Sequence, residues 1–512
     1  MDKIKEIWIQ AAIFFIVGII WRLPFQSKIL HEWDSVNFAL ALDKYDLRLH
    51  QPHPPGMFFL YILSGRLFNF FIPDANASLV WVSTIATGFA AATIFILGQT
   101  WFGRQTGSTI ALLMLSSPLI WFQGEVALSY MLEFFWVLLI VWGCYHLRYG
   151  NKLVFFSTAI LLGLAGGIRP NTPFFLFPLW AIAVFIGCRE HKYKLTDVLL
   201  AVILGLISVC IWLIPMVASS GGIDEFWQTM QPWLEKHPKD GIGRSLLDED
   251  NVSSLEGVYL NFKLLLEAVL YGIGFGLFPL IWWLGDSRKE LKQKFLKDWR
   301  WQTLLIWLLP GLFYLIFVHI KRLGHSFTIL PVFIIIAGIA IAEASKSWQK
   351  KQQKAKVILP GIIFLGNILF FTLGPANWQT SLPTWETIIQ YDRYISERVA
   401  AISRRFSPIE TMVLTTGRNG RIREFYLAEY SGTGYDSQPG EAEEIITLPE
   451  NIRNLVLFED KVLSDLESEP EYETITLPSQ ATIRYLTWDE NRQVKLSKYS
   501  LSIEEKKEDN SI

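Results

Sequence analysis

Residues 31–56 read HEWDSVNFALALDKYDLRLHQPHPPG and follow the apolar run 7–25, IWIQAAIFFIVGIIWRLPF. The apolar run is long enough to cross a hydrocarbon layer of about 30 Å. The stretch after it is rich in carboxylates, histidines and prolines, and ionisable groups beside membrane spans usually serve a function. We therefore expect the rest of the chain to hold residues 31–56, or to face them, at a membrane surface.

The composition supports this view, because 51% of the 512 residues are hydrophobic and long apolar runs recur as far as about Leu373. Beyond that point the sequence is polar and charged. It predicts a polytopic α-helical membrane domain, residues 1–377, and a soluble α/β domain, residues 378–512. Eleven runs are predicted to span the membrane: 7–25, 78–99, 107–122, 129–147, 153–168, 172–188, 197–217, 262–284, 302–319, 325–345 and 357–374.

Basic loops fix the expected orientation, since Lys and Arg in short loops stay cytoplasmic. The strongest are the loops 288–300 and 346–356. Lys3 and Lys5 place the N-terminus on the same side, ahead of a first span that we expect to be uncleaved. The acidic segment 219–260 and the C-terminal domain then lie outside.

Segment 57–72 decides whether the orientation is consistent. If it crossed the membrane, every later basic loop would change sides. It is short and Gly65-Arg66 interrupts it, so we expect an interfacial helix after an outer loop at 26–56. The alternative is that it does cross and that another span is miscounted.

The C-terminal domain has helical periodicity over 384–405 and strand-like apolar runs at 411–415, 454–458 and 483–487. Residues 481–501 predict a hairpin that turns at 489–491. Residues 503–512 are expected to form a disordered tail.

Several classes of function are disfavoured. The chain has no basic domain that would indicate nucleic-acid binding, and its net charge is −2. The C-terminal domain has no nucleophile elbow, phosphate loop or metal-ligand spacing. Cys144, Cys188 and Cys210 form no CxxC pair, so packing is their expected role.

Two candidate site residues lie in the opening stretch. The Asp34 carboxylate can accept a proton from an acceptor hydroxyl or bind a cation, although an aspartate before Ser-Val-Asn-Phe also suits a helix start. Asp43 and Asp46 are interpreted as solvated or capping. His53 precedes Pro54-Pro55, which would aim its ring, although an incidental histidine in a proline-built loop is an equal alternative.

Further candidates follow later in the chain. Glu125 and Glu133 are acids near or within a span, where they face a cavity or form an ordinary ion pair. Arg169 lies in an outer loop against the positive-inside trend. His319, Lys321, Arg322 and His325 crowd another outer loop. So many potential cations on the outer side indicate a bound phosphate or pyrophosphate, with lipid headgroups as the alternative ligand.

In this order, the motifs resemble the GT-C superfamily of integral-membrane glycosyltransferases, and most nearly the protein O-mannosyltransferase and aminoarabinose transferase branch, glycosyltransferase family 39. That branch has an acidic residue shortly after its first span, matched by Asp34, and a Pro-Pro motif after a basic residue, matched by residues 53–55. Residues 101–104 resemble its cytoplasmic turn, 161–173 its Gly-Leu…(Lys/Arg)-Pro segment, and 321–331 its late lysine-containing loop. The C-terminal domain matches no family that we can name.

The chain departs from the pattern at one place. Related transferases have a second aspartate near the second outer loop, where this chain has Ala127-Leu128-Ser129-Tyr130. Either Glu125 or Glu133 would have to substitute. This absence puts a two-carboxylate or metal-bridged scheme in doubt.

The resemblance implies transfer of a sugar from a polyprenyl-phosphate carrier to a lipid, glycan or protein acceptor, with inversion, at the outer face of a plasma or inner membrane. Asp34 would be the general base, and Arg169, Lys321 and Arg322 would bind the phosphate. His53, Glu125 and His325 are the other expected substrate-binding residues. No cofactor is expected besides the lipid-linked donor, and a divalent metal has no support in the sequence.

Two other classes remain open. A transporter or flippase of lipid-linked substrates would also explain cations on the outer face, but no inverted repeat is visible and the polar groups gather at one surface. A non-catalytic membrane scaffold is consistent with the missing second aspartate.

Overall fold

A computed structural model describes residues 2–52, 58–236, 254–286, 293, 295, 297–349, 355–377, 382–416, 419–432, 445–464, 466–497 and 499–505. The chain divides into two compact units. The first contains Met1–Ser27 and Ala41–Ile388, and the second contains Lys28–Leu40 together with Ile389–Ile512. The contacts therefore group the segment that carries Asp34 with the C-terminal residues, which the sequence did not indicate.

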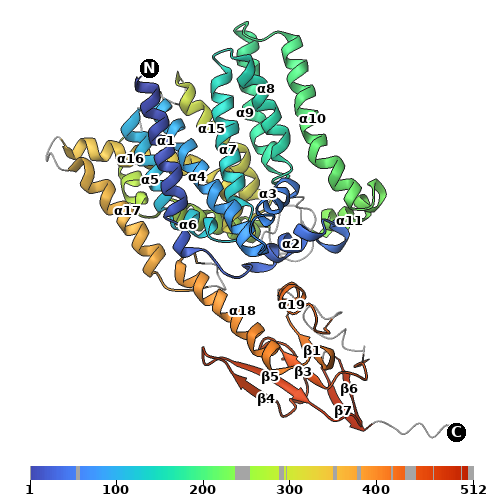
Figure 1. The fold of residues 1–512 in the computed structure, drawn as a ribbon. Coiled ribbons are helices and arrows are strands. Elements are labelled where there is room, and N and C mark those ends of the chain that lie inside the picture. The colour runs from blue at the N-terminus through green and yellow to red at the C-terminus, as the bar shows by residue number, and fades with distance from the viewer. Residues whose placement is uncertain are drawn as a thin grey trace. The chain divides into compact units, whose positions relative to one another are not determined.

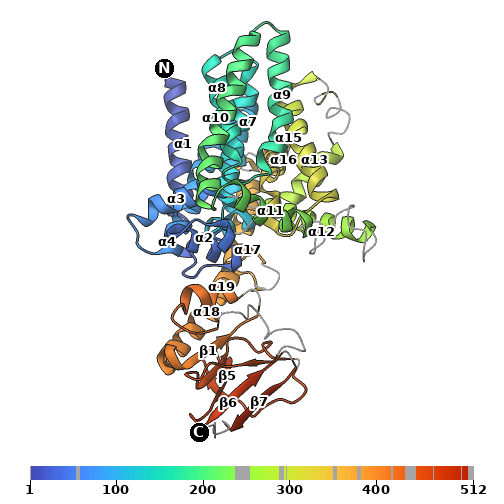
Figure 2. The ribbon, with the colours of Figure 1, turned by 90° about the vertical axis from the view of Figure 1, so that its right-hand side faces the viewer.

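The first unit is helical, and helices α7 to α10 run side by side in it (Figures 1 and 2). Its elements, with α2 shared between the units, are α1 (Asp2–Ile20), η1 (Leu23–Phe25), α2 (Glu32–Asp43), η2 (Leu47–Leu49), α3 (Phe59–Asn69), α4 (Ala75–Phe102), α5 (Arg104–Ser116), α6 (Pro118–Gly124), α7 (Tyr130–Leu147), α8 (Lys152–Ala165), α9 (Thr172–Arg189), α10 (Leu195–Ser219), α11 (Ile223–Lys236), α12 (Ser254–Ile273), η3 (Gly274–Gly276), α13 (Leu277–Asp286), α15 (Trp299–Phe317), η4 (Leu323–Thr328), α16 (Leu330–Gln349) and α17 (Ala355–Leu373).

Eight helical segments of the described chain are long and apolar enough to cross a membrane, and each coincides with a predicted span. The protein is therefore an integral membrane protein. Two further predicted spans correspond to the shorter apolar helices α8 and α17. The predicted span 107–122 is wrong as a single helix. Ser117 ends α5, its side chain caps α6, and Pro118 begins α6, so the run is broken in the middle.

The predicted span 325–345 also begins later than expected, because α16 starts at Leu330. Residues 323–328 form η4 instead. Pro331 suits the first turn of a helix, where its missing N–H needs no partner and its ring meets no preceding turn. His325 consequently lies outside the span.

Helix α3 covers the segment on which the orientation depends. Its eleven residues extend about 16 Å, roughly half of a hydrocarbon layer. The Arg66 guanidinium donates to the carbonyls of Ala41 (3.0 Å) and Leu42 (2.7 Å), at the C-terminal end of α2. The residue that interrupts the apolar pattern thus satisfies carbonyl groups that a helix end leaves without partners.

Helices α8 and α10 approach each other closely because α8 has Gly163 on the contact face and two further glycines follow its C-terminal end. A Cβ on Gly163 would collide with the Gly205 carbonyl oxygen. The Trp212 side chain of α10 donates to the Gly163 carbonyl (2.9 Å). The same indole fills the space beside Gly166 and Gly167, where an added Cβ would lie 2.7 Å from it. Small residues at such contacts allow backbones to pack in a membrane.

The second unit holds most of α18 (Trp385–Arg405), α19 (Gly420–Tyr426) and two small sheets. Strands β1 (Thr411–Leu414), β3 (Asn454–Leu457), β5 (Thr482–Thr487) and β4 (Glu473–Thr476) form one sheet in the order β1-β3-β5-β4, with β1 and β3 parallel. Strands β2 (Ile446–Thr447), β6 (Arg492–Leu496) and β7 (Leu501–Glu505) form the other, which is antiparallel. A single hydrophobic core, which includes Leu455, Leu486 and Val494, joins the two sheets.

The three predicted strands are confirmed as β1, β3 and β5. The hairpin predicted over 481–501 is wrong, since β5 pairs with β3 and β4 whereas β6 pairs with β2 and β7. The turn at 489–491 carries the chain from one sheet to the other. The tail predicted from residue 503 also begins too early, because residues 503–505 belong to β7. Residues 506–512 lie outside the described residues.

The close packing of α8 on α10 predicts a stability effect. We expect Gly163→Ala to lower the free energy of unfolding by about 1–3 kcal/mol, since the added methyl group meets backbone that cannot move aside. Gly285→Ala in α13, where an added Cβ meets nothing within 4 Å, is the control and should leave stability equal or slightly higher. Thermal unfolding in detergent measures both variants. Equal melting temperatures for the two would contradict the packing.

Candidate functional site

A polar cluster gathers at the N-terminal end of α7, within the first unit. It combines residues from α7, from the loop between α8 and α9, and from the segment between α15 and η4. We call it the α7 cluster. Its members are Ser129, Tyr130, Glu133, Arg169, Thr172, His319, Lys321, Arg322 and His325.

An ion pair between Arg169 and Glu133 forms the centre of the cluster. The Arg169 Nε lies 3.2 Å from a Glu133 carboxylate oxygen, and both side chains are almost entirely buried. The Thr172 hydroxyl donates to the other carboxylate oxygen at 2.6 Å, and an Arg169 Nη lies 3.4 Å from the Ser129 hydroxyl. These bonds fix the orientation of the guanidinium. They are costly to break, because removing one partner of a buried pair leaves an uncompensated charge at a cost of about 3–5 kcal/mol.

Aromatic rings flank the same guanidinium. The Arg169 Cζ lies 4.6 Å from the centre of the Tyr130 ring and 5.6 Å from that of Phe58. Both separations fall within the range of cation–π attraction. The rings exclude water from one side of the cation, so its charge acts on a nearby anion with little screening.

The segment before η4 brings the second group of cations. The Lys321 backbone N–H donates to the His325 Nδ1 (3.4 Å), and the His319 and His325 ring centres are 5.7 Å apart. The His325 ring also lies 6.2 Å from that of Tyr130. Lys321 and Arg322 retain partial exposure. The structure therefore places this loop and Arg169 in one cluster.

The expected positive charge on His325 is not present at neutral pH. Burial, followed by repulsion from Arg169 and from the neighbouring His319, Arg322 and Lys321, holds the pKa of His325 well below its usual range. The imidazole is neutral and can donate or accept a hydrogen bond. The cluster keeps Arg169, Lys321 and Arg322 as its cations against the carboxylate of Glu133.

The structure distinguishes the two acids that could replace the missing aspartate. Glu133 lies in the α7 cluster. Glu125 lies outside it, fully buried, with a carboxylate oxygen 3.5 Å from Arg22 at the end of the first span. Arg22 also donates to the carbonyls of Leu115 (3.3 Å) and Ile120 (3.5 Å). Glu125 thus belongs to a contact between the first span and the α5–α6 break.

Asp34 lies in the first turn of α2, two residues after the helix begins at Glu32. It is partly exposed and belongs to the second unit. A carboxylate in a first turn is stabilised by the positive end of the helix dipole. Because α2 starts earlier than the sequence indicated, Asp34 is a helical residue and not the cap.

His53 lies outside the described residues. Of the two aspartates interpreted as solvated or capping, Asp43 is exposed, whereas Asp46 is buried and caps η2 by accepting from the Arg48 backbone N–H (3.1 Å). Asp46 also accepts from the Arg48 guanidinium (2.9 and 2.8 Å), and this bond holds the pKa of Asp46 below its usual range.

Sequence reasoning missed Tyr130, Thr172 and Phe58. A usable signal existed for Tyr130, which precedes Glu133 by three residues and so shares its helix face. Thr172 follows Arg169 by three residues, across Pro170. Nothing in the sequence connected Phe58 with either segment.

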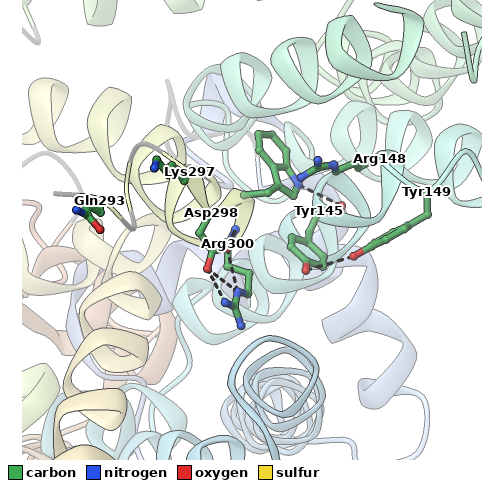
Figure 3. Close-up of a pocket in the computed structure, with 8 residues that line it drawn as sticks. Tyr145, Arg148, Tyr149, Gln293, Lys297, Asp298 and Arg300 are labelled. Carbon is green, nitrogen blue, oxygen red and sulfur yellow. Dashed lines mark hydrogen bonds and ion pairs between the residues drawn. The ribbon is translucent and has the colours of Figure 1, made fainter. Parts of the chain in front are cut away.

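A cavity of about 880 Å³ lies at the other end of α7 (Figure 3). Arg148, Lys297 and Arg300 contribute cations to its lining, and Arg300 is ion-paired with Asp298 at 2.5 Å. Tyr145 in this lining is fifteen residues along the helix from Tyr130, a distance of about 22 Å. This cavity lies among the loops that are expected to be cytoplasmic. We therefore assign the site from the α7 cluster and not from the cavity.

The environment of Glu125 predicts a pH effect on stability. Burial, partly offset by Arg22, raises the pKa of Glu125 from its ordinary value of 4.5 to about 8. The folded protein then keeps a proton that the unfolded chain releases. Stability should fall as pH rises from about 4.5 to 8, by up to about 1.4 kcal/mol per pH unit.

Thermal unfolding in detergent at pH 5 and pH 8 measures this slope. We expect Glu125→Gln to remove the Glu125 contribution while folding normally, because Arg22 keeps its two carbonyl acceptors. A variant with the same pH dependence as the wild type would contradict the raised pKa.

Comparisons with known proteins bear on the fold. No family model matches the chain, and no curated protein matches its sequence. Among solved structures, ArnT from Cupriavidus metallidurans bound to undecaprenyl phosphate matches with a TM-score of 0.59 and 10% identity, over 94% of this chain and 98% of that chain. The apo state of the same ArnT matches over the same shares with a TM-score of 0.54.

An oligosaccharyltransferase from Archaeoglobus fulgidus, in complex with zinc and sulfate, matches with a TM-score of 0.45 and 13% identity, over 88% of this chain and 67% of that chain. The two ArnT matches span both the membrane helices and the C-terminal region. At 10% identity they establish the fold alone. The resemblance that the sequence motifs indicated is thereby confirmed at the level of the fold: this chain has the fold of ArnT.

Proposed function

We propose that this protein is a glycosyltransferase that moves a sugar from a polyprenyl-phosphate carrier to an acceptor at the outer face of the membrane. The observation that carries the proposal is the α7 cluster, which holds three cations at one end of a bundle with the fold of ArnT. The ArnT structure contains bound undecaprenyl phosphate. A lipid phosphate is the anion that a membrane-surface cation cluster would meet.

Arg169 is the proposed anchor of the phosphate. Its Nε is occupied by Glu133, and Tyr130 and Phe58 pack against its faces. Lys321 and Arg322 carry further positive charge on a neighbouring segment. Three cations against one acidic side chain leave the cluster with an excess of positive charge, which offsets the charge of a phosphate group.

These cations also have a chemical role in the proposal. As the bond between the anomeric carbon and the phosphate oxygen breaks, negative charge grows on the departing lipid phosphate. Fixed cations in a water-poor site stabilise that charge without reorganising. The neutral imidazole of His325 is suited to form a hydrogen bond with an oxygen atom of the lipid-linked sugar donor. His53 and Glu125 were also expected to bind substrate, and we now propose that Glu125 instead holds the first span through Arg22.

Asp34 is the proposed general base. Its carboxylate accepts the proton of an acceptor hydroxyl or amine as that atom attacks the anomeric carbon. A new bond forms on one face of the sugar while the bond to the phosphate breaks on the other, so the configuration inverts. The role is supported by the matching position in the GT-C pattern and by the placement of Asp34 in the first turn of α2.

The proposed outer location is supported by charge. The cluster lies at the end of α7 that the positive-inside rule assigns to the outside, and the basic residues Arg148, Lys297 and Arg300 lie at the other end. The N-terminus would then be cytoplasmic. Glu6, near the start of α1, forms an ion pair with Arg104 at the start of α5. This contact is consistent with the starts of both helices lying on the same side of the membrane.

The role of Asp34 predicts that Asp34→Asn abolishes transfer, with a loss of at least about 100-fold in kcat, because an amide cannot accept the proton. Asp43→Asn, an exposed position at the end of the same helix, should retain activity. The assay incubates purified protein with radiolabelled polyprenyl-phosphate sugar and cell-envelope extract. Full activity in Asp34→Asn would exclude it as the base.

The same assay, with the protein reconstituted into lipid vesicles, separates the classes of function. Label that reaches an acceptor supports the transferase. Label that crosses a vesicle membrane without transfer supports a transporter. If the label is neither transferred nor moved across the membrane, the result supports a scaffold.

The role of the cations predicts that Lys321→Ala weakens binding of undecaprenyl phosphate by about 10- to 100-fold, the usual loss for a hydrogen bond to a charged group. The Michaelis constant for the acceptor should change much less. Lys297→Ala, at the opposite end of α7, is the control. Binding is measured by thermal stabilisation in detergent across a titration of the lipid. Weaker acceptor binding with unchanged lipid binding would contradict the phosphate role.

A further inference from the structure

The segment that leads into α2 is held by side chains of the C-terminal region, inside the second unit. Alternate backbone N–H groups make the contacts. The Lys28 N–H donates to the Asp392 carboxylate at 2.7 Å, the Leu30 N–H to the Tyr426 hydroxyl at 2.9 Å, and the Glu32 N–H to the Tyr391 hydroxyl at 3.2 Å. The contacts end two residues before Asp34.

Ring packing and a local bond extend this attachment to the helix. The His31 ring is buried, and its centre lies 4.4 Å from that of the Tyr391 ring. The Ser35 hydroxyl donates to the His31 carbonyl oxygen, which ties the first turn of α2 to the held segment. Asp34 therefore lies between Glu32, whose backbone N–H is bound by Tyr391, and Ser35, whose hydroxyl is bound to His31.

The backbone itself indicates that this geometry is imposed. Glu32 has a φ of +71°, in the left-handed region that residues with a side chain rarely adopt. Such a conformation persists where surrounding contacts determine it. At Glu32 the Tyr391 hydroxyl takes the backbone N–H, and the ring of the same tyrosine packs on His31.

The side chains that hold the segment are themselves fixed. Tyr391 and Asp392 are in α18, whose Ile395 and Ile402 are fully buried. The Arg398 guanidinium of α18 donates to the Phe458 carbonyl (2.9 Å) directly after β3. Tyr426 ends α19, and the nearby Tyr430 hydroxyl donates to the Phe406 carbonyl (2.9 Å) just beyond α18. The anchors thus rest on a packed scaffold.

We propose that the C-terminal domain positions Asp34, with Tyr391, Tyr426 and Asp392 as its positioning residues. The role in catalysis rests on the proposed function of Asp34 as general base. The domain fixes the direction in which the first turn of α2 presents its carboxylate. Since displacement of a reacting group by about 1 Å can cost 100-fold in rate, this attachment would set the turnover.

The test combines Tyr391→Phe with Tyr426→Phe in the full-length protein. Both substitutions keep the rings and remove the two hydroxyl acceptors. We expect faster hydrogen exchange in a peptide covering residues 28–34, measured by mass spectrometry. We also expect kcat to fall at least about 10-fold while the Michaelis constant for the lipid-linked donor stays within about 2-fold.

Tyr485→Phe is the matched control. It removes a hydroxyl in β5 of the same domain that donates to Glu473 (2.6 Å), and it should alter neither readout. Asp392→Asn, which keeps an oxygen acceptor for the Lys28 N–H, should behave closer to wild type than Asp392→Ala.

Each result has a distinct meaning. Unchanged exchange in the double variant would overturn the attachment itself. Faster exchange with unchanged kcat would overturn its role in positioning. Wild-type protein that shows protection of residues 28–34 but transfers no sugar would overturn the proposed function, and the positioning role with it, whereas the exchange data would still establish the attachment.

Discussion

The buried pair of Arg169 and Glu133 is the interaction on which the rest of the candidate site depends. A guanidinium near the end of a membrane helix is costly without a partner, and Glu133 and the Tyr130 ring supply partners from a single face of α7. Thr172 and Ser129 complete the arrangement. Once Arg169 is fixed, the loop of His319 to His325 needs only to pack against Tyr130 to bring its cations to the same place. The chain thereby gathers charge from three separate segments without a metal ligand set among its described residues.

Much of this fold can be predicted from the sequence because insertion into a membrane imposes simple rules on the length and polarity of each segment. Hydrocarbon thickness sets the length of a span, so most of the predicted spans coincide with helices. The exceptions have local causes. Ser117-Pro118 supplies a cap and removes an N–H, which breaks an apolar run that hydropathy treats as continuous. In the C-terminal domain, β5 and β6 are adjacent in sequence but belong to different sheets, because apolar alternation identifies a strand and not its neighbour.

The candidate site was only partly legible for a related reason. Arg169 and the cations of the later loop were recognisable because the positive-inside rule predicts few basic residues in loops on the outer side. Their partners were not, since pairing depends on which helices meet. Glu125 and Glu133 are alike as sequence, yet one contacts Arg22 and the other Arg169. The neutrality of His325 likewise depends on burial and neighbouring charge, which appear only in three dimensions. The attachment of residues 28–32 to Tyr391, Tyr426 and Asp392 joins positions more than 350 residues apart.

The contact between α10 and the end of α8 has a consequence for how this protein responds to its lipid environment. Trp212 fills the space beside Gly166 and Gly167, and Ile168 alone separates Gly167 from Arg169. On its other faces α10 exposes the apolar side chains of Ile203, Leu206 and Ile207. A bilayer thinner than the apolar length of a helix is accommodated in part by tilting of that helix. Tilting of α10 would carry Trp212 with it, away from or against Gly166 and Gly167, the second of which lies two residues before Arg169. The thickness of the membrane would in this way reach the cation on which the candidate site depends.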